Sequence, residues 1–85
     1  MNWVLILDDD AKRQLSKIPK EEALHIGRAI DEIVIDPYFG DIQKIKGEKE
    51  TWRKRVGSYR ILYELYKVQG VVYVFEIKRR TSKTY

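Results

Sequence analysis

The sequence predicts an α+β fold in which two N-terminal helices pack on one face of a twisted antiparallel sheet. Apolar residues recur at helical spacing between residues 11 and 34, whereas they alternate with a two-residue period from residue 52 onward. The turns between the later segments are short, which favours antiparallel neighbours over helical crossovers. A chain of 85 residues has surface for one hydrophobic core, so we expect a single domain over residues 1–85.

The first 36 residues are predicted to form a strand and two helices. The apolar, β-prone run at residues 3–7 is the strand, and it ends at Asp8-Asp9-Asp10. Any of these three carboxylates can cap a first helix over residues 11–18. Pro19 suits a first helical position and begins a second helix, which ends at Asp36-Pro37.

The remaining sequence predicts four strands, so the sheet has about four strands plus the N-terminal one. The first, at residues 42–45, is weak, and the others cover residues 52–56, 59–67 and 71–78. In the third, Tyr59, Ile61, Tyr63 and Leu65 alternate with more polar residues, which indicates one buried face.

Charge is distributed unevenly along the chain, whose net charge is +4. Residues 1–42 carry five Lys and Arg against nine Asp and Glu, whereas residues 43–85 carry twelve against four. Such a basic half favours a polyanionic partner, because each cation that neutralises a phosphate releases condensed counterions. A solvated charged surface is the alternative.

The composition also indicates where the protein resides. The sequence contains no cysteine, which excludes disulfides and thiolate metal sites and is typical of a reducing compartment. The apolar run near the N-terminus spans five residues and follows no basic segment, so we expect neither a signal peptide nor a membrane span. We therefore expect a cytoplasmic protein with no membrane partner.

Residues suited to other catalytic chemistries are sparse. His25 is the only histidine, and a half-exposed position on the second helix is the simpler interpretation of it. No serine has a neighbouring histidine, so a nucleophilic triad lacks its members. The three contiguous aspartates point in different directions and fit a helix cap better than a metal site. We expect no cofactor and no metal.

The basic residues, by contrast, interleave with the predicted strands. The two-residue period puts Arg53 and Arg55 on one face of their strand, with Trp52, Lys54 and Val56 on the other. Two guanidiniums side by side repel each other unless an anion lies between them.

Further basic residues can join this pair. Arg60 begins the next strand, Arg79 and Arg80 follow the last one, and Tyr85 ends the sequence. We hypothesise that these residues converge on one concave anion site. The alternative is an exposed arginine face that keeps the sheet from aggregating.

Three stretches carry a family resemblance: Lys44-Ile45-Lys46-Gly47, then residues 52–64 with the sequence WRKRVGSYRILYE, then residues 74–80 with Tyr85 at the end. They resemble the RelE/ParE superfamily of type II toxins, and the resemblance covers the whole chain. It implies the RelE-like fold, in which one strand is followed by two helices and then by four strands.

The RelE branch of the superfamily implies a ribosome-dependent mRNA endonuclease, in which a ribose 2′-hydroxyl attacks its own phosphate. The resemblance implies that the catalytic positions are occupied by Arg53, Arg55, Arg60, Arg79 and Tyr85. It makes Arg60 the phosphate-holding arginine and Arg79 the arginine at the leaving group. We expect further RNA contacts from Lys46, Lys54, Lys78, Arg80 and Lys83.

One departure from the family concerns the general base. The basic pair of the third strand, often lysines in RelE-like enzymes, is Arg53 and Arg55 here, and a guanidinium is a poor proton acceptor. Tyr85 is the first candidate for the base, with Lys54 or Lys83 as the fallback.

Two other functions stay open at this point. A ParE-like inhibitor of DNA gyrase has the same fold and does not require the arginine and tyrosine set, and a non-catalytic RNA-binding module is the third hypothesis. The resemblance implies a cognate RelB-like antitoxin, which forms a hetero-oligomer with the toxin, and the RelE branch adds the ribosome and mRNA. We expect acidic side chains of the antitoxin near Arg53, Arg55 and Arg60.

Overall fold

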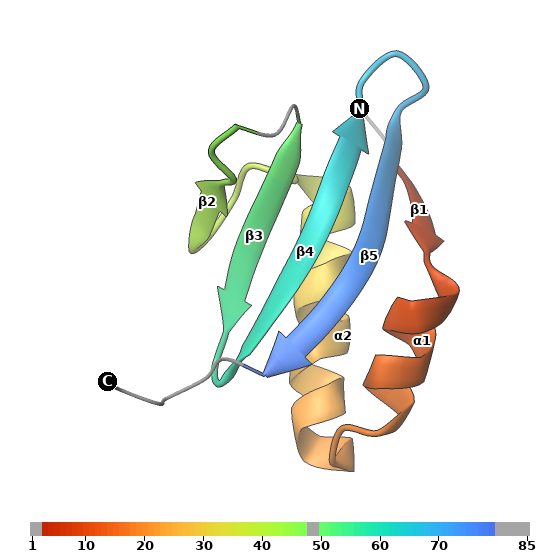
Figure 1. Ribbon diagram of the computed structural model, residues 1–85, viewed down its shortest axis with the longest axis vertical. Coiled ribbons are helices and arrows are strands. Elements are labelled where there is room, and N and C mark those ends of the chain that lie inside the picture. Colours follow the sequence, from red (N-terminus) through yellow and green to blue (C-terminus); the bar gives the residue numbers. More distant parts are fainter. Residues whose placement is uncertain (1–2, 48–49, 80–85) are drawn as a thin grey trace.

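The structure is a computed structural model that describes residues 3–47 and 50–79 (Figure 1). The described elements, in chain order, are β1 (Val4–Leu7), α1 (Asp9–Ser16), α2 (Lys20–Ile35), β2 (Ile42–Lys44), β3 (Thr51–Val56), β4 (Tyr59–Tyr66) and β5 (Val71–Arg79).

The strands form a single sheet in the order β1-β5-β4-β3-β2. Strands β2 to β5 are antiparallel neighbours, as their short turns predict, whereas β1 runs parallel to β5 with Val4 opposite Val71. The predicted α+β class with a strand followed by two helices and four strands is therefore confirmed. The sheet is mixed and not wholly antiparallel as predicted, because β1 pairs in parallel with β5, which lies more than 60 residues away in the sequence.

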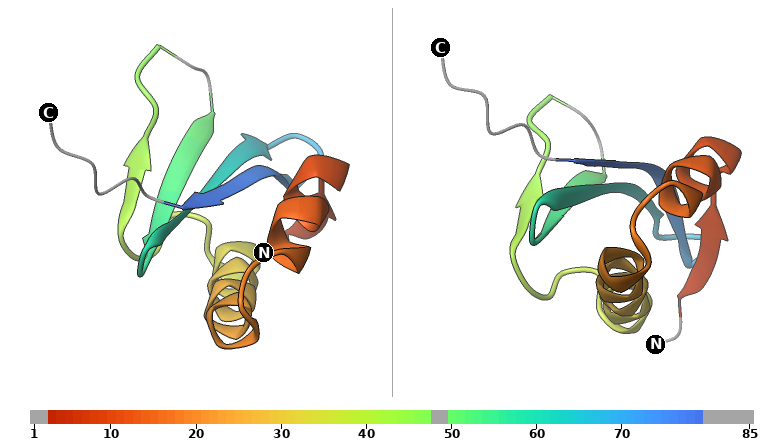
Figure 2. Two further views of the ribbon diagram at one scale, coloured as in Figure 1. Left: turned by 60° about the horizontal axis from the view of Figure 1, so that its bottom comes forward. Right: turned by 90° about the horizontal axis from the view of Figure 1, so that it is seen from below.

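Both helices begin within two residues of their predicted starts, α1 at Asp9 in place of residue 11 and α2 at Lys20 in place of Pro19. Asp8 caps α1, because its carboxylate accepts a hydrogen bond from the Asp10 N–H at 3.0 Å. Pro19 is the N-cap of α2, and Asp36 ends the helix just before Pro37. Figure 2 shows α2 lying across one face of the sheet, with α1 beside β5. The position of α1 is fixed by Gln14, whose Oε1 accepts from the Ile77 N–H at 2.8 Å on the part of β5 beyond β1.

The core lies between α2 and the sheet. Strand β4 alternates as predicted: Tyr59, Ile61, Tyr63 and Leu65 are buried toward the helices. They pack with Ile26, Ile30 and Ile33 of α2 and with Val72, Val74 and Ile77 of β5. The alternate residues of the strands point to the opposite side of the sheet, which we call the open face. None of the described helices covers this face.

The connection between α2 and β2 accepts hydrogen bonds from side chains on the helix side of the sheet. The Tyr63 hydroxyl donates to the Pro37 carbonyl at 2.6 Å, and burial raises the pKa of this hydroxyl. Lys54 Nζ donates to the Phe39 carbonyl at 3.3 Å. Two strands of the sheet therefore hold the segment that leads into β2.

No helix in the described part of the chain is long and apolar enough to cross a membrane.

Candidate nucleic-acid interface

Three cations stand directly side by side across the open face. Arg55 of β3 is the register partner of Arg60 on β4, and Arg60 is in turn the partner of Lys78 on β5. Directly opposed residues have Cβ atoms about 5 Å apart, and like charges in such pairs are destabilising. We call Arg55, Arg60 and Lys78 the cationic row. It lies at the end of the sheet where β3 and β5 end and β4 begins, which is the lower end in Figure 1.

Arg60 is the centre of the row, and its hydrogen bonding is incomplete. Its side chain is only partly exposed, and its Nε is buried without a hydrogen-bond partner among the described residues. A buried donor without an acceptor costs about 1–3 kcal/mol. Because guanidinium geometry matches a phosphate, an anion bound at the row supplies the missing acceptor and separates the repelling charges.

Strand β2 and the residue before it place a polar side chain beside each of the two arginines of β3. Gln43 Oε1 accepts from Arg53 Nη2 at 2.6 Å, directly across the β2–β3 pair. Asp41 Oδ2 lies 3.8 Å from Arg55 Nε, and both side chains are substantially exposed. Arg53 and Arg55 share the open face, as the two-residue period predicts, but each already has a neighbour from β2 or the segment leading into it.

The structure does not bring Lys54 to the cationic row. Its side chain is 5% exposed and points to the helix side, where Nζ lies 2.9 Å from Glu32 Oε1 and 5.5 Å from the centre of the Phe39 ring. The prediction that Lys54 contacts RNA is thus inconsistent with its position, because strand alternation sends it away from Arg53 and Arg55. For the same reason Lys54 is unsuited to act as a general base on the open face.

Two other predicted residues also lie apart from the row. Arg79 is the register partner of the buried Tyr59, so its side chain starts on the helix side of the sheet, although it is exposed. Lys46 lies in the β2–β3 turn, beyond the Lys44–Trp52 pair and at the opposite end of β3 from Arg55. Arg80, Lys83 and Tyr85 lie outside the described residues.

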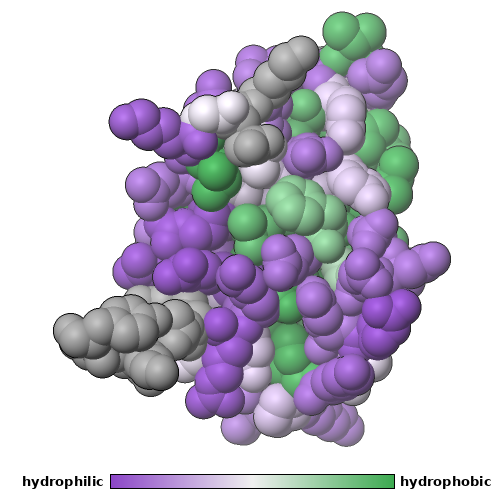
Figure 3. Space-filling model, in the orientation of Figure 1, coloured by the Kyte–Doolittle hydropathy of each residue, from purple (hydrophilic) through white to green (hydrophobic). Residues whose placement is uncertain are grey.

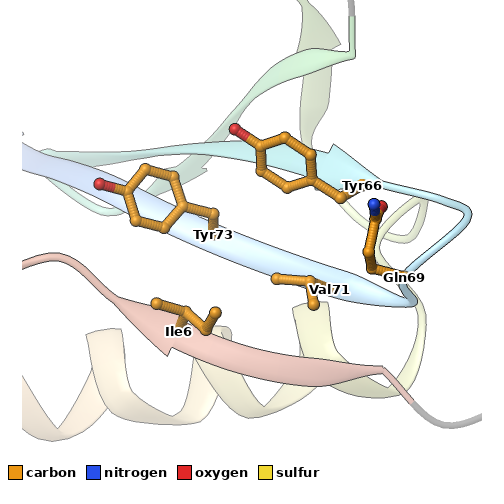
Figure 4. Close-up of a pocket in the computed structure, with 5 residues that line it drawn as sticks. All are labelled: Ile6, Tyr66, Gln69, Val71 and Tyr73. Carbon is orange, nitrogen blue, oxygen red and sulfur yellow. The ribbon is translucent and has the colours of Figure 1, made fainter.

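A different surface occupies the other end of the open face. Figure 3 shows hydrophilic side chains along the left and lower edges of this face and hydrophobic ones mainly from its centre to its upper right, with a smaller hydrophobic group low in the middle. A cavity of about 320 Å³ lies there, lined by Ile6, Tyr66, Gln69, Val71 and Tyr73 (Figure 4). We call it the aromatic pocket. No local sequence pattern indicates this pocket, because it depends on the parallel pairing that puts Ile6 opposite Tyr73.

Both tyrosines of the aromatic pocket have a fixed hydroxyl. Tyr66 donates to Glu64 at 2.7 Å, and this bond raises its pKa. Tyr73 donates to the Asp8 carboxylate, which raises the pKa of Tyr73 to about 12 and lowers that of Asp8. The pocket thus combines apolar walls with carboxylates at its rim, a poor environment for a phosphate and a suitable one for an apolar side chain.

His25 is exposed on α2, as its position in the sequence suggests. It lines a cavity of about 70 Å³ with Glu22 and Ser58, beside the β3–β4 turn. The described residues contain no group of three or more His, Asp or Glu side chains arranged to hold a metal ion.

The sequence matches, over residues 5–83, the family described as "ParE toxin of type II toxin-antitoxin system, parDE". The chain belongs to this toxin family. Membership confirms the predicted RelE/ParE superfamily and makes the protein the toxin of a type II toxin–antitoxin system. Comparison with curated protein sequences gives no match.

Solved structures share the toxin's fold along nearly its whole length. The archaeal RelE–RelB complex from Pyrococcus horikoshii matches with a TM-score of 0.84 and 20% identity, covering 98% of this chain and 100% of that one. The isolated RelE toxin of E. coli also gives 0.84, at 17% identity, with 95% and 87% covered. The YoeB/ParE toxin from Agrobacterium tumefaciens gives 0.77 at 14% identity, with 92% and 99% covered. At these identities the likeness establishes the fold.

Proposed function

We propose that the toxin is an endoribonuclease that cleaves mRNA on the ribosome and binds the scissile phosphate at the cationic row. One observation carries this proposal: Arg60, whose buried Nε has no acceptor within the described part of the chain, stands between Arg55 and Lys78 in direct cross-strand register. Cations placed in advance around a phosphate stabilise the extra negative charge of the phosphorane. An exposed arginine face that only aids solubility would not bury a guanidinium nitrogen without a partner.

In the proposed reaction the 2′-oxygen forms a bond to phosphorus and the bond from phosphorus to the 5′-oxygen breaks. A base takes the 2′ proton and an acid protonates the 5′-oxygen, which leaves a 2′,3′-cyclic phosphate and a 5′-hydroxyl. Arg60 and Arg55 hold the non-bridging oxygens. Lys78, the member of the row on β5, is our candidate for the acid in place of Arg79, which the register puts on the other face. Tyr85 remains our candidate for the base. The reaction as written requires no metal.

The proposed partners use both ends of the open face. A cognate RelB-like antitoxin would place acidic side chains at the cationic row and an apolar side chain in the aromatic pocket, because that pocket has apolar walls and carboxylates around it. Binding across the row would exclude RNA and keep the toxin inactive as a toxin–antitoxin hetero-oligomer. Ribosome and mRNA are the targets once the antitoxin is lost, which places the action in the cytoplasm.

An in vitro translation reaction tests the proposal. The toxin is added to translating ribosomes, and the ends of the mRNA fragments are identified. We expect fragments with 2′,3′-cyclic phosphate ends from the native toxin and from Arg28→Ala, which removes an exposed cation of α2. Arg60→Ala should abolish cleavage without loss of the folded state. Intact mRNA at high concentrations of folded native toxin would contradict the proposal, and RNA binding without cleavage would indicate the non-catalytic module.

A second candidate function is inhibition of DNA gyrase. The family that matches residues 5–83 is described as one of ParE toxins, and this description favours the gyrase alternative. Gyrase and plasmid DNA are incubated with the toxin, and covalent gyrase–DNA complexes are counted. Accumulation of these complexes with uncut mRNA in the translation reaction would decide for the gyrase function.

A further inference from the structure

We propose that Asp41 is a built-in competitor of RNA phosphate for Arg55, and that it lowers the affinity of the cationic row for free RNA. This inference rests on the proposed function, since it concerns the same phosphate site. Asp41 is the acidic residue that the structure pairs with a member of the row, with Oδ2 at 3.8 Å from Arg55 Nε. A phosphate that binds between Arg55 and Arg60 has to displace this carboxylate from the guanidinium.

The backbone keeps Asp41 beside Arg55 whatever its side chain does. The Arg55 N–H donates to the Asp41 carbonyl at 2.9 Å, next to the Ile42–Lys54 register pair. The preceding residue, Gly40, has a φ of +96°, and a Cβ there would come within 3.0 Å of Lys54 Nζ. Because the turn is packed this closely against β3, the carboxylate remains within reach of the guanidinium.

The ion pair is weak enough for a substrate to displace. The side chains of Arg55 and Asp41 are 40% and 61% exposed, and such exposed pairs shift an equilibrium by about a factor of five at most. This competition lowers the affinity of every RNA that uses Arg55 by the same factor. An RNA held by further contacts, as on a ribosome, stays bound despite that loss, whereas an RNA that binds weakly through its phosphates alone is released.

Gln43 provides a neutral counterpart on the same strand edge. Its Oε1 accepts from Arg53 at 2.6 Å without placing a negative charge at the site. Changing it to a carboxylate would create a second competitor of the same kind, two residues from Asp41. The two positions thus allow the competition to be removed at one arginine and introduced at the other.

The test is the binding of a short single-stranded RNA, 2′-O-methylated so that it cannot be cleaved, to the full-length toxin over a series of salt concentrations. Asp41→Asn should bind the RNA about two- to fivefold more tightly at low salt. The slope of log affinity against log salt should steepen by up to about 0.7, the value of one further phosphate contact. Asp31→Asn is the control, because it removes the same charge from an exposed site on α2.

Gln43→Glu should weaken binding, and Gln69→Glu at the distant β4–β5 turn should have a smaller effect. Thermal unfolding confirms that each variant is folded. If Asp41→Asn and Asp31→Asn bind alike while Arg60→Ala loses affinity, the inference is wrong and the phosphate site stands. If Arg60→Ala binds the RNA as tightly as the native toxin, the row does not bind RNA, and both the proposed function and this inference are wrong.

Discussion

Arg55 and Arg60 face each other directly across the β3–β4 pair, and over residues 3–47 and 50–79 the one ion pair that either guanidinium makes is that of Arg55 with Asp41, at 3.8 Å. Opposed like charges are avoided in sheets because each pair lowers stability. Lys78 adds a third positive charge on the other side of Arg60. The row therefore lowers the stability of the folded toxin on its own, and it raises the affinity of the toxin for an anion.

Because the row lowers stability in the absence of an anion, Arg60→Met is expected to stabilise the folded toxin. Methionine keeps the apolar part of the side chain and removes the charge and the buried Nε, so we expect the free energy of unfolding to rise by about 0.2–1 kcal/mol at low salt. The gain should shrink at high salt, where repulsion is screened. Thermal unfolding measures it, with Arg28→Met on α2 as the control. A loss of stability for Arg60→Met at every salt concentration would contradict the argument.

Lys54 and Glu32 give a second prediction. The ammonium is nearly buried and the carboxylate is about half exposed, at 2.9 Å from each other. Of the partners that the described residues offer, Glu32→Ala leaves the buried cation with the Phe39 carbonyl and ring, and it should cost about 1–3 kcal/mol in the free energy of unfolding. Lys54→Met, which removes the cation itself, should cost less. Denaturant unfolding of both variants and of the double variant checks this order; equal losses in both single variants would argue against it.

The order of the elements could be read from the sequence, because local signals define each of them. The switch from helical to alternating periodicity separates the helices from β3 to β5, and Asp8, Pro19 and Asp36 lie at the helix ends. The pairing of β1 with β5 has no such local signal. It joins segments more than 60 residues apart in the sequence, so the aromatic pocket that depends on it could not be predicted either.

The sequence predicted the candidate site correctly for those residues whose face of the sheet follows from strand alternation. Alternation puts Arg53, Arg55 and Arg60 on one face, and the structure agrees. The family resemblance assigned a role to Arg79, but it does not show which residues face each other across neighbouring strands. The β4–β5 pairing shows that Lys78, one residue earlier, is the residue that faces Arg60. Alternation also argued against Lys54 as an RNA ligand, since it faces the helices with Trp52.

The Asp8–Tyr73 hydrogen bond predicts a pH dependence of stability. The bond from Tyr73 lowers the pKa of Asp8 below its ordinary value of 3.8, and it raises the pKa of Tyr73 from 10.0 to about 12. A lowered carboxyl pKa stabilises the folded toxin above pH 3.8, and this stabilisation is lost as the pH falls through the folded value. A raised tyrosine pKa stabilises it below pH 10.0, and that contribution is lost between there and about pH 12.

We therefore expect Tyr73→Phe to melt at a lower temperature than the native toxin at neutral pH. The difference should vanish at pH values well below 3.8, where Asp8 is protonated in both states. Tyr66→Phe is the comparison, because its hydroxyl bonds to Glu64 within the same strand and joins no separate elements. A Tyr73→Phe difference that is constant from acid to neutral pH would exclude the ionised Asp8 as its cause.

The aromatic pocket predicts a variant that separates antitoxin binding from activity. Ile6 is 47% exposed and lines the pocket, so Ile6→Asp leaves the core intact and puts a carboxylate where we propose an apolar antitoxin side chain. The variant should be neutralised less well by its cognate antitoxin and should retain the activity of the native toxin. Titration of the antitoxin into the translation reaction measures this. Unchanged neutralisation would show that the antitoxin does not use the pocket.

Lys78 and Arg79 lie on opposite faces of the sheet, so substituting each in turn tests which of them donates the proton to the leaving group. The two residues are adjacent at the end of β5, but only Lys78 is opposite Arg60 on the open face. If the phosphodiester lies on the row, Lys78→Met should reduce the cleavage rate by about 100-fold or more, the usual contribution of a general acid, while Arg79→Met should have a much smaller effect. Because both variants remove one positive charge from neighbouring positions, a general loss of electrostatic attraction affects them alike. Single-turnover cleavage rates give the comparison, and a larger loss for Arg79→Met would assign the acid to the residue that the family resemblance indicates.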